Sequence, residues 1–190
     1  MRATAPGQSA LLLLDVIGVL KKSRVPYAVI GAFAASFYGV VRASMDADAV
    51  IFLPKGSADL ETWHLRFQDA GLKSTIRRGD AHDPIGAVLN LEDRFHNRVD
   101  LLLNIRGVTA AALPRAIETE FLRARISIIG LEDFIAMKIF AGSPQDLDDV
   151  AGVLKVSHGR IRLPLLTRLV DAYGTNAKRT LQSLWRANAS

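Results

Sequence analysis

Three aspartates in this sequence have the spacing to hold a divalent cation. Asp46 and Asp48 are separated by one residue at the polar start of the run DADAVIFLP (46–54), and Asp100 is the single acid inside the apolar run NRVDLLLN (97–104). Alternate side chains of a strand share a face, so we expect Asp46 and Asp48 to project together, about 6–7 Å apart. Neighbouring carboxylates repel each other, and a bound cation relieves that repulsion. Their oxygen ligands suit Mg²⁺ or Mn²⁺.

Asp100 is expected to complete this group. A lone carboxylate in a buried strand is costly unless it is paired or bound to a metal. If 97–104 lies beside 46–54, three carboxylates meet at one edge of the sheet. That arrangement suits two-metal phosphoryl transfer, or one metal with Asp100 as a general base. A structural interpretation stays open, because Asp-x-Asp pairs are common in turns and Asp100 could pair with Arg98 or Arg42.

Several other chemistries lack their residues. The chain has no cysteine, which excludes disulfides, thiolate metal sites and cysteine nucleophiles. Its four histidines do not have the spacing of a zinc site; they are His64, His82, His96 and His158. The sequence also contains no G-x-S-x-G, Walker A or G-x-G-x-x-G motif.

The elements that must position the aspartates can be read from periodicity and from Gly and Pro. Strands are expected at 25–30, 46–54, 72–77, 85–92, 97–104 and 124–130. Helices are expected at 9–23, 32–39, 57–70 with Ser57 as N-cap, 109–118 with a bend at Pro114, 131–142, 144–156, 163–174 and 176–187. This order predicts an α/β (α+β) protein: a mixed-sheet core over residues 1–130, then a helical region packed on it over 131–190.

Composition is that of a globular protein, with 49% hydrophobic and 23% charged residues. The apolar stretch 10–20 is too short for a membrane span and is interrupted by Asp15, so we expect a cytoplasmic protein without a membrane partner. The whole net charge of +5 comes from the residues after 159, which include six basic residues and a single acidic residue, Asp171. That basic region could approach RNA or a triphosphate, or simply form a solvated helical face.

The string YAVIGAFAASFYGVVRASMDADAVIFLP (27–54) resembles the signature of the nucleotidyltransferase superfamily, whose fold is polymerase-β-like. In that signature an apolar-Gly-Gly/Ser turn precedes an Asp-x-Asp pair by roughly nine to thirteen residues. The string is similar to a small bacterial branch related to the AbiEii-type toxins and other minimal nucleotidyltransferases. Arg42 and Ser44 fill the branch's Arg-x-Thr/Ser positions before the acidic pair. A second block, 131–154, is similar in its helical Lys138 and in Asp146 and Asp149.

The resemblance implies a metal-dependent transfer of a nucleoside monophosphate from a triphosphate to an acceptor hydroxyl. It implies that Asp46, Asp48 and Asp100 are catalytic and hold the metal. It also implies a nucleotide-binding set, which comprises Gly31, Ala32, Arg42, Ser44, Lys138 and Asp146. The acceptor could be tRNA or another RNA, a protein or a small molecule, and the branch suggests a toxin–antitoxin role with a cognate partner protein.

Two positions depart from the family pattern. Ala32 stands where Gly or Ser is usual, and Gln145 stands where relatives often carry Lys or Arg. Ala32 keeps open an alternative function as a non-catalytic module that binds nucleotide or a partner protein. Structural roles also stay open for the second block. Ser143-Pro144 with Asp146 has the pattern of a helix cap, and Lys138 could pair with Glu132 or Asp133.

Overall fold

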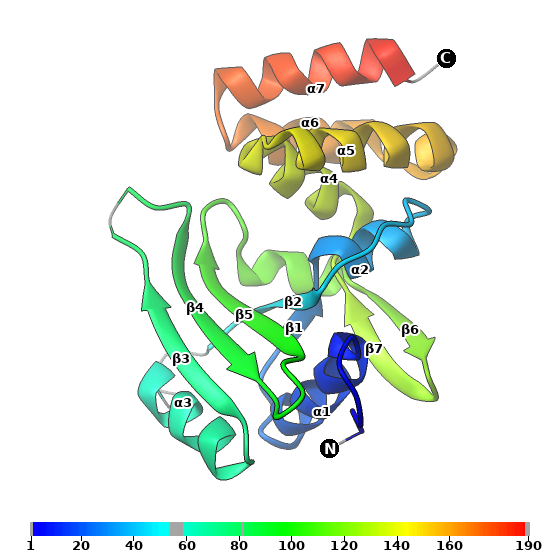
Figure 1. Cartoon of the computed structure of the whole chain (residues 1–190). Coiled ribbons are helices and arrows are strands. Elements are labelled where there is room, and N and C mark those ends of the chain that lie inside the picture. The colour runs from blue at the N-terminus through cyan, green and yellow to red at the C-terminus, as the bar shows by residue number, and fades with distance from the viewer. Residues whose placement is uncertain (1, 54–58, 81, 189–190) are drawn as a thin grey trace.

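A mixed seven-stranded sheet forms the centre of the computed structural model, which describes residues 2–53, 59–80 and 82–188 (Figure 1). The strands lie in the order β3-β4-β5-β2-β1-β7-β6. Their bounds are β1 Tyr27–Val29, β2 Asp46–Ile51, β3 Lys73–Arg78, β4 Ile85–Glu92, β5 Arg98–Ile105, β6 Ile117–Phe121 and β7 Ala124–Ile128. β2 runs parallel to β5 on one side and antiparallel to β1 on the other, and β1 is parallel to β7. The predicted mixed sheet is therefore confirmed.

Helices pack on the sheet and gather at one of its ends. α1 (Ser9–Lys22) contacts β2, β5 and β7, and α3 (Leu60–Asp69) contacts β3 and β4. The short α2 (Gly31–Phe37) crosses beside β2. The α-helices after residue 130 form a helical region at one end of the sheet (Figure 1); they are α4 (Leu131–Ala141), α5 (Pro144–Ser157), α6 (Leu163–Asp171) and α7 (Thr175–Asn188). The 3-10 turn η1 (Ala110–Arg115) lies between β5 and β6, and η2 (His158–Arg160) lies between α5 and α6. No helix in the described residues is long and apolar enough to cross a membrane.

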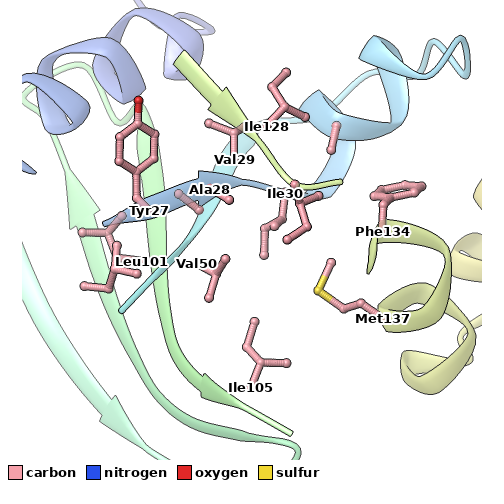
Figure 2. Close-up of a cluster of buried hydrophobic side chains, with 14 of the residues drawn as sticks. Tyr27, Ala28, Val29, Ile30, Val50, Leu101, Ile105, Ile128, Phe134 and Met137 are labelled. Carbon is pink, nitrogen blue, oxygen red and sulfur yellow. The ribbon is translucent and has the colours of Figure 1, made fainter. Parts of the chain in front are cut away.

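One hydrophobic core joins the sheet to the helical region. Val29 and Ile128 of the central strands lie on one side of this junction, and Phe134 and Met137 of α4 lie on the other (Figure 2). The buried Tyr38 hydroxyl donates a hydrogen bond to the Ile129 carbonyl at 2.5 Å. Because α4 is buried along almost its whole length, the helical region is anchored by apolar packing as well as by chain continuity.

The segment 109–118 is not the helix that the sequence analysis predicts. It forms the 3-10 turn η1, and the chain then turns into strand β6, which the sequence analysis missed. Pro114 accounts for the difference, because proline cannot donate the hydrogen bond that would continue a helix and its ring clashes with the preceding turn. The predicted N-cap Ser57 lies outside the described residues, and the cap observed for α3 is Asp59, which accepts from the Thr62 amide.

The β6–β7 hairpin has a strained turn. Phe121 pairs with Ala124, so the loop consists of Leu122 and Arg123 alone, and both adopt positive φ (48° and 63°). Two-residue hairpin loops with two positive φ angles favour Asn and Gly, and other L-residues are disfavoured there. A hairpin without that signal is difficult to detect from sequence.

We expect the double substitution Leu122→Asn with Arg123→Gly to raise the free energy of unfolding by about 1–2 kcal/mol, because it removes this strain. Urea unfolding monitored by circular dichroism measures the change. The matched control, Leu122→Asn with Arg123→Ala, keeps a side chain at the second positive-φ position and should gain clearly less. Equal stabilities for the two double variants would contradict the assignment of strain to this turn.

Candidate active site around three aspartates

The sheet brings Asp46, Asp48 and Asp100 together. β5 lies next to β2 in parallel, and Asp48 and Asp100 are direct partners in the register. Asp46 and Asp48 share a face, and the intervening Ala47 is buried on the opposite face. All three carboxylates are half-buried. A rigid central strand pair therefore holds three acids on one surface, where no side-chain flexibility is needed to bring them near one another.

The electrostatics of Asp48 reflect this crowding. Burial, followed by the charges of Asp46 and Asp100, raises the pKa of Asp48 to about 6, while Lys138 and Arg42 oppose the rise. Within the described part of the chain, none of the three acids is in an ion pair. The cluster thus carries negative charge that direct contacts with cations do not neutralise.

Neutral side chains make the hydrogen bonds of the outer two carboxylates. The Ser44 hydroxyl donates to Asp46 Oδ1 at 2.7 Å, and the Asn90 amide Nδ2 donates to Asp100 Oδ1 at 2.8 Å. The open alternative that Asp100 pairs with Arg98 or Arg42 is therefore wrong. Asn90 was missed by the sequence analysis, although it is the only polar residue between Ile85 and Leu91 and could have been noticed for that reason.

Gly31 lies against the central carboxylate. It begins α2 with a φ of +63°, and a methyl group at this position would overlap Asp48 Oδ2. Only glycine accommodates both the backbone conformation and this close approach. The Ile30 amide just before it donates to the Asp48 carbonyl at 3.0 Å. The glycine of the predicted motif therefore sets how near α2 comes to the acids.

A second charged cluster lies where α4 and α5 face the acids. Lys138 Nζ is 2.5 Å from Asp146 Oδ1 and 2.9 Å from Asp149 Oδ2, and Arg42 Nε is 3.2 Å from Asp149 Oδ1. The alternative pairing of Lys138 with Glu132 or Asp133 is wrong, because those acids bind Arg162 and Arg115.

Asp146 combines two roles. Its carboxylate contacts Lys138, and it also completes a capping box with Ser143 at the start of α5, with Pro144 in the first turn. The predicted helix cap is confirmed, and it coexists with the contact to Lys138. Burial raises the pKa of Asp146, but hydrogen bonds with Lys138 and Ser143 and the charge of Lys138 outweigh this effect and hold the pKa below its usual range.

Three depressions adjoin the acids, and together they reach every residue of the predicted set. A cavity of about 230 Å³ between the sheet and α4 has Gly31, Asp48, Lys138 and Asp146 in its lining. A larger one of about 380 Å³, between α2 and the β6–β7 hairpin, has Ala32, Arg42, Ser44 and Asp46. A third of about 230 Å³ lies over β3, β4 and β5 and has Asp46 and Asp100.

The donor atoms do not form a ready metal site. Among residues 2–53, 59–80 and 82–188, no three histidine or acidic side chains are arranged as a metal-binding group. Their chemistry nevertheless fits a hard cation, because three oxygen-donating acids lie together and no ion pair among the described residues neutralises them. Mg²⁺ typically takes only one or two protein carboxylates and completes its shell with phosphate oxygens and water.

Solved structures with similar architecture were found, whereas no family model and no curated sequence matches the chain. An antigenic nucleotidyltransferase-like protein from Paracoccidioides brasiliensis aligns with a TM-score of 0.53, 12% identity, 98% coverage of this chain and 92% of the other. ANT(2'')-Ia in complex with adenylyl-2''-tobramycin aligns with a TM-score of 0.59 and 13% identity, over 87% of this chain and 96% of the other. The lincosamide antibiotic adenylyltransferase LnuA, lincomycin-bound, aligns with a TM-score of 0.50 and 12% identity, over 81% of this chain and 99% of the other.

At these identities the similarity establishes the fold. The chain has the nucleotidyltransferase fold over most of its length, as the resemblance in residues 27–54 suggests. The narrower link to the AbiEii-type branch has no counterpart among these structures.

We expect Asp48→Asn to stabilise the folded protein at pH 7–8 in metal-free buffer. The folded-state pKa of about 6 exceeds the value near 3.9 of an unfolded aspartate, so the wild type loses stability as pH rises from about 4 to about 6. Asparagine removes that loss, which is on the order of 1–3 kcal/mol. Chemical unfolding of both proteins from pH 4 to 8 measures it. Glu118→Gln, at an exposed acid of β6, is the control, and parallel pH profiles for wild type and Asp48→Asn would contradict the account.

Proposed function

We propose that this protein is a nucleotidyltransferase that moves a nucleoside monophosphate from a triphosphate to an acceptor hydroxyl. The observation that carries the proposal is the group of three half-buried acids on β2 and β5, unpaired in the described structure, beside the cations Lys138 and Arg42. The fold shared with adenylyltransferases supports the same chemistry. Anions placed together at structural cost are typical of sites that receive a cationic or phosphorylated ligand.

The nucleoside fits the cavity between the sheet and α4. Its walls are largely apolar, with Leu102, Ile105, Met137 and Phe140 in the lining, and such surfaces suit a base and ribose. Asp48 and Lys138 lie at its polar side, which directs the phosphates toward the acids. Lys138 and Arg42 then oppose the phosphate charge.

Asp46 and Asp48 are the residues that would hold a divalent cation, with Asp100 as a third donor. When bound, Mg²⁺ or Mn²⁺ would neutralise charge on the triphosphate and orient it. The protein side chains have separate tasks. Gly31 permits close approach to Asp48, Ser44 orients Asp46, and Asn90 orients Asp100.

Asp100 is placed to act as the general base. It takes the proton of the acceptor hydroxyl, whose oxygen attacks the α-phosphorus. A new P–O bond forms, the bond to the β-phosphate oxygen breaks, and pyrophosphate leaves. Asn90 keeps one carboxylate oxygen of Asp100 occupied, so the other is available for the proton.

The acceptor is proposed to bind over β3, β4 and β5. The depression next to Asp100 is polar, with Lys73, Thr75, Glu92 and Arg98 in its lining. Its volume of about 230 Å³ suits a small hydroxyl compound, and two structures of the same fold carry adenylyl-tobramycin and lincomycin. RNA and protein acceptors belong in the same assay, because the sequence leaves them open.

The test is label transfer from each α-³²P nucleoside triphosphate in Mg²⁺ or Mn²⁺, with tRNA, lysate protein, an aminoglycoside and a lincosamide as acceptors. Pyrophosphate release gives a second readout that depends less on the acceptor. We expect Asp100→Asn to lower transfer by about 10²–10⁴-fold while triphosphate binding persists, because the base is removed while Asp46 and Asp48 remain to hold the cation. Asp46→Ala and chelation by EDTA should each abolish transfer.

The control is Asp15→Asn on α1, which should transfer at the wild-type rate, because Asp15 pairs with Arg2 and lines none of the three depressions. Triphosphate binding without transfer to any acceptor would favour the alternative of a non-catalytic nucleotide-binding module. A wild-type protein that neither binds nor turns over any triphosphate would overturn the proposed function.

A further inference from the structure

Helix α5 packs unusually closely against the loop that carries Arg42. Gly152 faces this loop, and a Cβ atom on it would lie 2.7 Å from Val40 Cγ2. In return, a Cβ atom on Gly39, whose φ is +97°, would lie 2.8 Å from Val156 Cγ1. The two glycines therefore allow a distance between helix and loop that larger residues would prevent.

Asp149 extends the same face of α5. It lies three residues before Gly152 and seven before Val156, which places all three on one side of the helix. Its carboxylate is only 1% exposed and contacts two cations, Arg42 Nε at 3.2 Å and Lys138 Nζ at 2.9 Å. These cations come from elements about a hundred residues apart in the sequence, and Asp149 is the group that they share.

Stability alone is a weak reason for this arrangement. Buried ion pairs often contribute little net stability, because the desolvation cost offsets the attraction. The contacts also have imperfect geometry, since Arg42 Nε and Asp149 Oδ2 are buried without an aligned hydrogen bond despite their short ionic distances. A buried anion that fixes two cations beside a group of acids is better explained by what those cations bind.

We infer that Asp149 is a positioning residue, which holds Lys138 and Arg42 where they receive the phosphates of the nucleotide. The inference rests on the proposed function. Asp149 itself lines none of the three depressions, whereas Lys138 and Arg42 each line one. Without it, Lys138 would keep only its contact with Asp146 and would be free to turn toward Asp48 and occupy the carboxylate that the nucleotide needs.

A competing explanation predicts that Asp149→Asn strengthens anion binding instead of weakening it. With Lys138, Arg42, Asp146 and Asp149 all charged, this cluster is neutral. If Asp149 only competes with phosphate for the cations, Asp149→Asn leaves the cluster more positive and tightens the binding of an anion. If Asp149 positions the cations, the same substitution weakens that binding.

The experiment is calorimetric titration of wild type and Asp149→Asn with ATP plus Mg²⁺, with inorganic tripolyphosphate and with adenosine. We expect the affinities for ATP and tripolyphosphate to fall by about 10-fold or more, which corresponds to about 1.4 kcal/mol for each factor of ten. Adenosine affinity should change by less than about 2-fold, because the substitution acts only through the phosphate-binding cations. Glu132→Gln is the matched control, since Glu132 is an equally buried acid that pairs with Arg162 instead.

Gly152→Ala tests the same idea without altering charge. The added methyl group should push the Val40 loop away and weaken tripolyphosphate binding in the same direction, and Val40→Ala in that background should restore it. Gly18→Ala adds a methyl group where no atom lies within 4 Å, and is the neutral control. This pair keeps the inference testable if Asp149→Asn fails to fold.

Each outcome has one meaning. Unchanged or tighter tripolyphosphate binding by Asp149→Asn overturns the positioning role and leaves the proposed function intact. An equal loss of adenosine and tripolyphosphate affinity also overturns it, because it shows a general structural defect. If the wild type binds neither ATP nor tripolyphosphate, the proposed function fails and this inference fails with it.

Discussion

Repulsion among three carboxylates on adjacent strands is the constraint around which this structure is arranged. Asp48 and Asp100 lie side by side on two adjacent parallel strands, and Asp46 adds a third acid on the same face of the sheet. Folding alone would favour neutral residues at these positions, since the burial of Asp48 and its acidic neighbours raise its pKa to about 6. The sheet tolerates the cost because apolar residues fill the opposite face of the same strands, including Ala47, Val99 and Leu101. A fixed excess of negative charge on a rigid surface is the physical basis of the proposed site for a metal-bound phosphate.

Neutral hydrogen-bond donors contact the acids directly, whereas the nearby cations do not. Serine and asparagine hydrogen bonds orient the outer acids without neutralising them. Lys138 and Arg42 instead form ion pairs with Asp146 and Asp149. If Lys138 or Arg42 paired directly with the acids, these internal ion pairs would neutralise the negative charge of the three aspartates. The helical region thus has two physical roles: α4 closes the hydrophobic core and supplies Lys138, and α5 fixes the loop that carries Arg42.

Sequence reasoning recovered the parts of this arrangement that local patterns encode. Asp-x-Asp at a strand start, one acid in an apolar run and Ser-Pro before a helix each act over a few residues, and each is found where it was expected. The partners of buried charges could not be obtained in this way. Lys138 lies on a helix that is apolar nearly all round, so periodicity does not show which side meets α5. Arg42 and Asp149 meet only through the packing of α5 on the loop, and β6 was missed because its hairpin turn has neither Asn nor Gly.

The direction of β2 orders the proposed reaction in space. At the end of β2 near Val50, and of β5 near Leu102 and Ile105, the face is apolar and approaches α4, where the cavity suits a nucleoside. At the other end Asp46 is paired in register with Arg98, and the surface becomes polar across β3 to β5. Asp48 and Asp100 lie between these two ends. In the proposed reaction, a triphosphate entering from α4 presents its α-phosphorus to the acids, and an acceptor on the polar side approaches Asp100 from the opposite direction. Displacement of pyrophosphate requires the acceptor oxygen, the α-phosphorus and the pyrophosphate oxygen to lie roughly in line. The proposed reaction therefore places the pyrophosphate beside Lys138 and Arg42, neither of which lines the depression over β3, β4 and β5 where the acceptor is proposed to bind.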